Sequence, residues 1–81
     1  MILDKTVDMM LSDDYKERFR AEYHQLVNRE NKLQKMVKAY KDGKLDFKPK
    51  CSLDLLLWQL KTMQEYKYIL KRRAEIEKIE L

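Results

Sequence analysis

The stretch that decides the fold is residues 53–73, which read LDLLLWQLKTMQEYKYILKRR. It contains neither Gly nor Pro, and large apolar residues recur every three or four positions. That spacing is the period of an amphipathic α-helix. One apolar line along this helix and its continuation consists of Leu53, Leu56, Leu60, Met63, Leu70 and Ala74. A second line consists of Leu55, Trp58, Tyr66, Ile69 and Ile76.

Together the two lines cover more than half of the helix circumference, whereas packing against one neighbour needs a stripe of only about 100°. The helix is therefore expected to contact at least two others. Because a chain of 81 residues offers few partners, we expect some of them to come from further copies of the chain.

Length and composition predict one small helical domain spanning residues 1–81. Charged residues make up 40% of the chain, which has one Gly and one Pro. This composition is typical of a helical bundle or coiled coil. The net charge of +4 is spread without a block of like charge. It suits a small anionic ligand better than a DNA or RNA polymer.

Features of secreted and membrane proteins are not found in the sequence. Cys51 is the only cysteine, so no disulfide can form within the chain. No apolar run approaches the roughly 20 residues that cross a bilayer, and residues 1–11 do not resemble a signal peptide. We expect a cytoplasmic protein that does not bind membranes.

Capping and turn residues divide the chain into four segments. Ser12 and the two aspartates after it favour a helix start, and Gly43 favours a helix end. Pro49 interrupts helix, and Ser52 favours a second start. We predict an N-terminal strap or short helix over residues 1–11, a helix over 13–42, a loop over 43–52 and a helix over 53–80. The expected fold is all-α: an antiparallel two-helix hairpin assembled as a homo-oligomer.

The helix over 13–42 has a narrower apolar stripe, and two polar residues interrupt it. Glu22 and Arg29 share the rotational position of Tyr15 and Leu33, where a purely structural helix would carry Leu or Ala.

The sequence does not predict an enzyme. His24 is the only histidine, and no motif connects it to Cys51. No cluster has the spacing of metal ligands, and no Gly-rich loop could hold phosphates. Glu22 and Glu30 could be an acid–base pair, but such spacings are common in charged helices. We expect no catalytic residue, no metal and no cofactor.

Ligand binding has better support, first on the helix over 13–42. Tyr15 lies in its first turn, where free N–H groups favour an anion and the ring could stack on a base; the alternative is a tyrosine at the edge of the core. Arg29 and Lys32 lie one turn apart and could reach one phosphate; the alternative is an ion pair of Arg29 with Glu22 of a neighbouring helix.

Further candidates lie in the last helix and the loop. Arg73 follows the same line as Tyr66 and could form a second site; the alternative is a salt bridge of Arg72 or Arg73 with a nearby glutamate, Glu75 or Glu77. Lys48 and Lys50 flank the loop proline, and most such lysines only increase solubility.

Two patterns resemble the small helical-hairpin family of phage proteins that includes the anti-CBASS cyclic-oligonucleotide sponge and the hairpin domain of an anti-Thoeris sponge. The first pattern is Tyr15-x-x-Arg18-Phe19-x-x-Glu22-x-x-x-Leu26-x-x-Arg29-x-x-x-Leu33. The second is Leu55-Leu56-x-x-Gln59-x-x-x-Met63-x-x-Tyr66-x-x-Ile69-Leu70-x-x-Arg73. The second is more specific, because a generic leucine-rich helix would not combine Gln59, Met63, Tyr66 and Arg73.

The resemblance implies compact oligomers, commonly hexamers, that bind cyclic di- or trinucleotides in pockets shared between protomers and do not cleave them. Such a protein would act in the infected bacterial cell by withholding the signal from a defence effector. The candidate ligand-binding residues are Tyr15, Arg18, Arg29, Lys32, Tyr66 and Arg73.

Two alternatives stay open from the sequence. The signal could be a cyclic ADP-ribose derivative, held in one or two classes of pocket. Alternatively, the chain could be a homo-oligomeric adaptor or inhibitor that binds a host protein directly, with Glu22 and Arg29 setting helix register.

Overall fold

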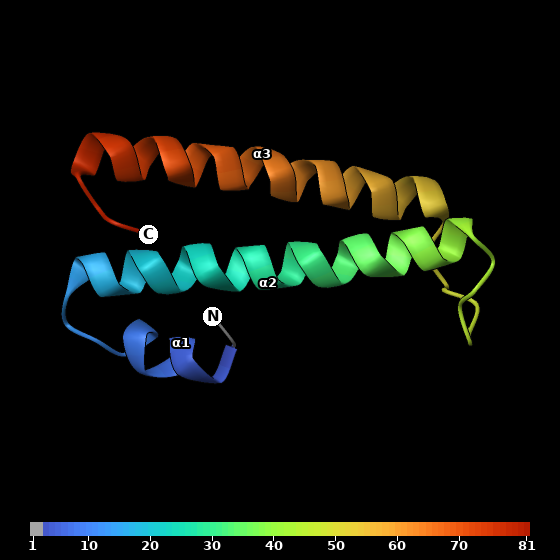
Figure 1. Cartoon of the computed structure of the whole chain (residues 1–81), viewed down its shortest axis with the longest axis horizontal. Helices are drawn as coiled ribbons and strands as arrows, with labels where there is room; N and C mark the ends of the chain where they lie inside the picture. The colour runs from blue at the N-terminus through green and yellow to red at the C-terminus, as the bar shows by residue number, and fades with distance from the viewer. Residues whose placement is uncertain (1–2) are drawn as a thin grey trace.

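The computed structural model describes the backbone of residues 3–81 and the side chains from Thr6 onward. Over that range the chain forms three helices and no strand: α1 (Leu3–Met10), α2 (Tyr15–Lys41) and α3 (Leu53–Glu77). Helices α2 and α3 lie side by side and run in opposite directions (Figure 1). The predicted all-α class is confirmed for these residues. The first two residues of the predicted strap lie outside the described range.

The expected capping residues define the ends of the two long helices. The Asp14 side chain accepts a hydrogen bond from the Lys16 backbone N–H at 2.9 Å. Ser52 caps α3 by accepting from the Leu55 N–H at 3.2 Å. Gly43 has a φ of 67°, a left-handed conformation that ends α2 without steric cost.

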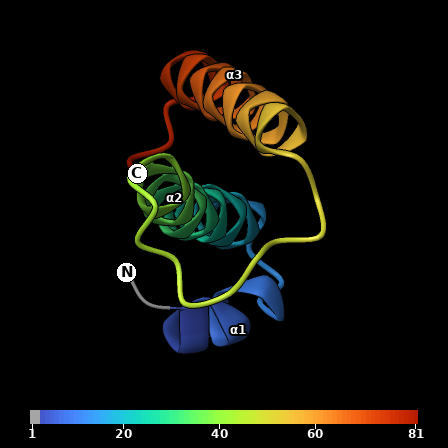
Figure 2. The same ribbon diagram turned by 90° about the vertical axis from the view of Figure 1, so that its right-hand side faces the viewer.

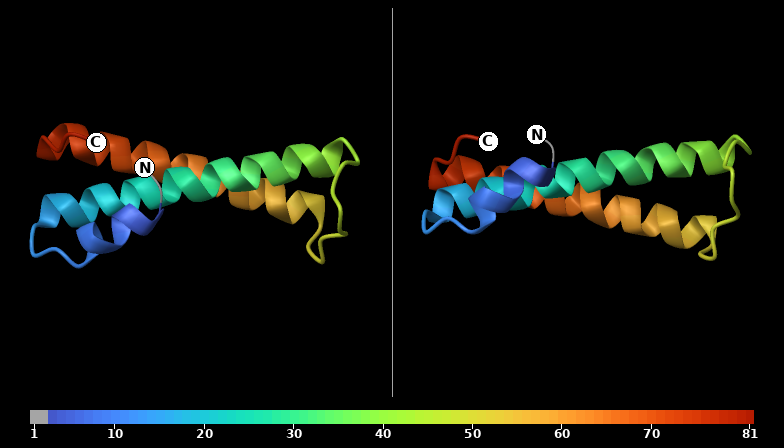
Figure 3. Two further views of the ribbon diagram at one scale, coloured as in Figure 1. Left: turned by 60° about the horizontal axis from the view of Figure 1, so that its bottom comes forward. Right: turned by 90° about the horizontal axis from the view of Figure 1, so that it is seen from below.

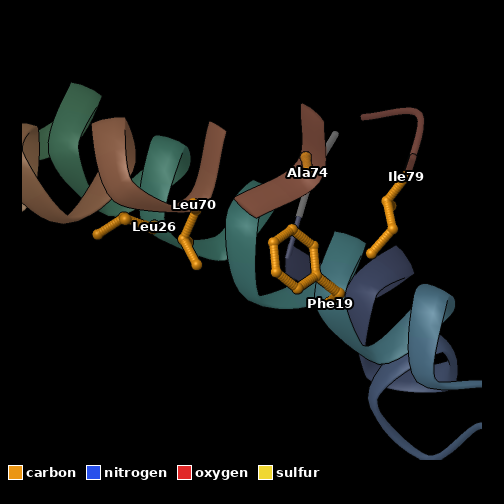
Figure 4. Packing of buried hydrophobic residues seen from close by; sticks show 5 residues of the cluster. All are labelled: Phe19, Leu26, Leu70, Ala74 and Ile79. Carbon is orange, nitrogen blue, oxygen red and sulfur yellow. The ribbon is translucent and has the colours of Figure 1, made fainter. Parts of the chain in front are cut away.

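The end of α3 differs from the prediction. The helix ends at Glu77 and not at residue 80, because Lys78 takes a left-handed φ of 57°. The chain then turns back, and Ile79 is buried against Phe19 and Ala74 (Figure 4). One more turn of helix would carry the Ile79 side chain away from the core. The free energy gained by burying this side chain therefore outweighs that of the extra helical turn.

Helix α2, and not the last helix, is the centre of the fold. It lies between α3 on one side and α1 on the other (Figure 2), and α1 crosses it near its N-terminal end (Figure 3). Helix α1 packs on α2 through Thr6, which is fully buried and accepts a hydrogen bond from the Gln25 side-chain amide at 3.0 Å. Ala21, one turn before Gln25, is also fully buried. The strap thus covers the side of α2 that faces away from α3.

The two apolar lines of α3 have different environments. The first line supplies the buried residues of this helix, Leu56, Leu60, Leu70 and Ala74. Leu70 packs beside Leu26 of α2 (Figure 4). The second line is exposed, with Trp58 at 69% and Ile76 at 72% of their full accessibility. Within the described chain α3 packs against α2 and not against α1, so half of its apolar surface has no cover.

One ion pair joins the long helices in the middle of the hairpin. Glu30 of α2 is only 3% exposed, and the Lys67 ammonium of α3 donates a hydrogen bond to its Oε1 at 3.1 Å and lies 2.8 Å from its Oε2. The sequence pattern singled out Glu22 and Arg29 as polar intrusions, yet both are exposed. Glu22 and Glu30 bind different partners on α3, so they do not form an acid–base pair.

No helix within residues 3–81 is both long enough and apolar enough to span a membrane.

Replacement of Leu70 by Ala should lower the free energy of unfolding by about 2–5 kcal/mol, because it removes a fully buried side chain and leaves a cavity. Leu11→Ala is the matched control, since Leu11 is 79% exposed and surface changes stay within about 0.5 kcal/mol. Urea denaturation at equal protein concentration measures both. Equal losses in the two variants would contradict the packing described here.

Candidate functional site

A pocket of about 410 Å³ opens at the end of the molecule where α2 begins and α3 ends. All three helices contribute to its lining. The lining residues are Met10, Tyr15, Arg18, Phe19, Glu22, Gln25 and Arg73. The pocket thus brings together residues from three parts of the chain. The end of the strap, two arginines and two aromatic rings meet beside the N-terminus of α2.

Arg73 is the most connected side chain of this pocket. Its Nη2 donates to the Tyr15 hydroxyl at 2.5 Å, and its Nε donates to Oε2 of Glu77 at 3.2 Å. Its guanidinium also lies over the Phe19 ring, 4.9 Å from the centroid, in a cation–π arrangement. Tyr15 and Phe19 from the start of α2 and Glu77 from the end of α3 therefore hold this guanidinium in place.

Tyr15 closes a triangle with Arg73 and Glu77. Its hydroxyl donates to Oε1 of Glu77 at 2.9 Å while it accepts from Arg73. The bond to the carboxylate raises the pKa of Tyr15, because the charge of Glu77 disfavours the phenolate. Its ring lies 6.2 Å from that of Phe19 at an interplanar angle of 54°. The Tyr15 side chain is exposed.

A second tyrosine approaches the pocket from α3. The Tyr66 hydroxyl donates a short hydrogen bond to Oε1 of Glu22, and this bond raises the pKa of Tyr66. Arg18 is held from the other side, since its Nη1 donates to the Ser12 carbonyl at 2.9 Å. The lining therefore combines two guanidinium groups with one carboxylate, Glu22. A second carboxylate, Glu77, does not line the pocket but binds Arg73.

The structure brings together only some of the predicted residues. Tyr15, Arg18 and Arg73 line the pocket, and Tyr66 reaches it through Glu22. Arg29 and Lys32 are exposed on α2, and Arg29 lies about 21 Å along the helix from Tyr15 at 1.5 Å per residue. Within one chain, Arg29 and Lys32 therefore lie far from the pocket that contains Tyr15.

Several members of the site were not predicted as binding residues. Phe19 and Glu22 appeared only as pattern or stripe positions, and Gln25 and Met10 were not singled out at all. The salt bridge of Arg73 with Glu77 was the structural alternative, and it is present, as is the pair of Arg72 with Glu75. The spacing of four residues between Arg73 and Glu77 was visible in the sequence, whereas the contacts of Glu22 and Gln25 cross between helices.

A second hollow lies on the uncovered side of α3. It measures about 520 Å³ and is lined by Leu55, Trp58, Gln59, Thr62, Met63 and Tyr66. Tyr66 thus lies between this apolar hollow and the charged pocket.

Other chemistry-bearing residues do not converge. Among the described side chains, no group of three or more His, Cys, Asp and Glu residues could hold a metal ion. Cys51 is exposed in the loop at the opposite end of the hairpin. His24 packs its ring against Tyr23, and burial lowers its pKa.

Glu77→Gln should lower the pKa of Tyr15, because the amide removes the negative charge that opposes ionisation of the phenol. Carbon-13 NMR titration of labelled tyrosine, with the Tyr15 resonance assigned by Tyr15→Phe, measures this change. Glu75→Gln is the control, since Glu75 pairs with Arg72. An unchanged Tyr15 titration in Glu77→Gln would mean that the triangle does not exist in solution.

Comparison with known proteins agrees with the resemblance seen in the sequence. No curated protein and no solved structure matches the chain significantly. A protein-family model described as Sequestin matches residues 13–76, which include the whole of α2 and nearly all of α3. The family name denotes sequestration of a molecule, which is a binding role and not a catalytic one. The match spans more than half of the chain, and the protein therefore belongs to the Sequestin family.

Proposed function

We propose that this protein is a phage-type immune-evasion sponge. It binds cyclic di- or trinucleotide second messengers in the cytoplasm of an infected bacterial cell and holds them without cleavage. The observation that carries the proposal is the pocket at the α2 N-terminus, where Arg18 and Arg73 lie beside the rings of Tyr15 and Phe19. Membership of a family named for sequestration supports the same conclusion.

The chemistry of the pocket matches a nucleotide. Guanidinium groups form charge-assisted hydrogen bonds with phosphate oxygens. An aromatic face adds about 1–3 kcal/mol for each stacked base. Arg73 is already oriented by Tyr15, Glu77 and Phe19, so little side-chain entropy is lost when it binds phosphate.

Assembly completes the proposed site. The uncovered apolar line of α3, with Trp58 and Ile69 exposed, is the surface through which further copies pack, and the resemblance makes a hexamer the expected assembly. In that arrangement Arg29 and Lys32 of one copy add positive charge to the pocket of another. The binding site is then shared between protomers.

The same exposed surface favours a second candidate function. A homo-oligomeric adaptor or inhibitor would use the apolar line of α3 to bind a host protein. Two measurements distinguish these functions. The melting temperature of a sponge rises as cyclic nucleotide is added, whereas that of an adaptor does not change. An adaptor also co-purifies with a protein.

Arg73→Ala should weaken cyclic nucleotide binding by about 10- to 100-fold, the equivalent of a charge-assisted bond of about 1.5–3 kcal/mol. Isothermal titration calorimetry with cyclic dinucleotides, cyclic trinucleotides and cyclic ADP-ribose derivatives measures it. Arg72→Ala is the matched control, because the neighbouring Arg72 pairs with Glu75 outside the pocket. If no member of the panel binds the unmodified protein at micromolar concentration, the proposal is wrong.

Trp58→Glu should dissociate the assembly, because it places a charge in the uncovered apolar line. Light scattering coupled to size-exclusion chromatography reports the mass of the particle. Leu11→Glu is the control, since Leu11 is equally exposed but follows α1, away from α3. If the parent protein is a monomer, the binding site cannot be shared between protomers, and that part of the proposal is wrong.

A further inference from the structure

The candidate pocket carries an unusual charge for a site that binds phosphate. Its lining combines two guanidinium groups with the carboxylate of Glu22, and a second carboxylate outside the lining, Glu77, is bound by both Tyr15 and Arg73. Glu77 thus occupies donors that would otherwise be available to a phosphate oxygen. A site selected only for the greatest affinity for anions would not keep such a carboxylate beside its central arginine.

The pocket nevertheless keeps donors for one anion. Of the five N–H groups of an arginine, Arg73 uses one on Glu77 and one on Tyr15. Arg18 donates one to the Ser12 carbonyl. The remaining N–H groups of both arginines have no partner among the described residues. Both arginines line the pocket, so N–H groups remain available to a phosphate while Glu77 stays in place.

Phosphate groups differ in the charge that they bring to this position. A phosphodiester within a cyclic nucleotide carries one negative charge. A terminal phosphate monoester carries about −1.5 to −2 at pH 7. Each phosphodiester bond that is hydrolysed in a cyclic nucleotide produces such a terminal phosphate, so a ring-opened messenger differs from the intact one by this added charge.

We propose that Glu77 is a specificity-determining residue of the pocket, because its charge lowers the affinity for terminal phosphates more than the affinity for singly charged phosphodiesters. The inference rests on the proposed function and adds to it the basis of ligand selection. Repulsion from the carboxylate acts on every anion, but it acts about twice as strongly on a terminal phosphate. One additional charge about 6 Å from the carboxylate weakens binding about threefold even at the dielectric constant of water, and more in a partly dry pocket.

This selection suits a protein that sequesters a scarce signal. Most nucleotides in a cell carry terminal phosphates, and so do the products of ring opening. A pocket with two free arginines would fill with them. The carboxylate lowers the affinity for every anionic ligand. Because it lowers the affinity for terminal phosphates more, a larger share of the pockets stays available for intact rings.

The test measures a ratio of affinities and not a single affinity. Cyclic di-AMP, cyclic di-GMP and cyclic GMP–AMP are each compared by calorimetry with the linear dinucleotide of the same bases that carries a 5′-phosphate. The proteins are the parent chain, Glu77→Gln, Glu77→Asp and the matched control Glu75→Gln.

Glu77→Gln should reduce the preference for the cyclic form by at least about threefold, with the linear form gaining more than the cyclic one. The ratio should stay at the parental value in Glu75→Gln, whose carboxylate belongs to another ion pair, and in Glu77→Asp, which keeps the charge. A residue that merely braced Arg73 would change the two affinities equally when replaced and would leave the ratio unchanged.

An unchanged ratio in Glu77→Gln, or an equal fall of the ratio in Glu77→Asp, would overturn the inference while leaving the proposed function intact. Failure of the parent protein to bind these three rings and the cyclic trinucleotides titrated beside them would instead overturn the proposed function. The two failures are therefore distinguishable in one set of titrations.

Discussion

Helix α3 carries more apolar surface than its one neighbour in the chain can cover. Its first apolar line, which includes Leu60 and Leu70, is buried on α2, and its second, which includes Trp58, is left in water. Large exposed apolar patches on a small protein mark interaction surfaces. Within the described residues, α2 thus covers one side of α3 and leaves the other side exposed, which is the surface that the proposed assembly uses.

The core is closed at one end by the return of the chain. The left-handed turn at Lys78 allows Ile79 to reach Phe19. The Arg20 guanidinium then holds this return by donating to the carbonyl of Glu80 at 2.6 Å. The same packing holds the last turn of α3 beside the first turn of α2, which places Arg73 and Glu77 next to Tyr15. The geometry of the pocket is therefore a consequence of how the core ends.

The carboxylate of Glu77 bound to Arg73 distinguishes this pocket from a general anion-binding surface. Free arginines attract any phosphate, whereas arginines held by carboxylates and ring contacts offer fewer donors in fixed positions. Fixed donors favour ligands of matching shape and charge. The network consists of Arg73, Tyr15, Glu77 and Phe19. It can orient the guanidinium group and, as proposed above, select among phosphate ligands.

Local chemistry in the sequence determined the helices, their starts at Asp14 and Ser52 and the end of α2 before Gly43, because caps and apolar periods act over a few neighbouring residues. It also showed the two lines of α3 and the possible pairing of Arg73 with Glu77. The candidate site was only half visible: Tyr15, Arg18 and Arg73 converge, but Arg29 and Lys32 do not.

Tertiary structure alone decided that α2 is the central helix and that Glu30 is buried. The strap is held on α2 by the hydrogen bond of Gln25 to Thr6, and a pattern of large apolar residues does not reveal such a contact. The return of the chain at Lys78 was equally invisible, because it depends on a space beside Phe19 that exists only when the helices are packed. Periodicity fixes which residues share a face, whereas the partner of each face depends on contacts between segments that are far apart in the chain.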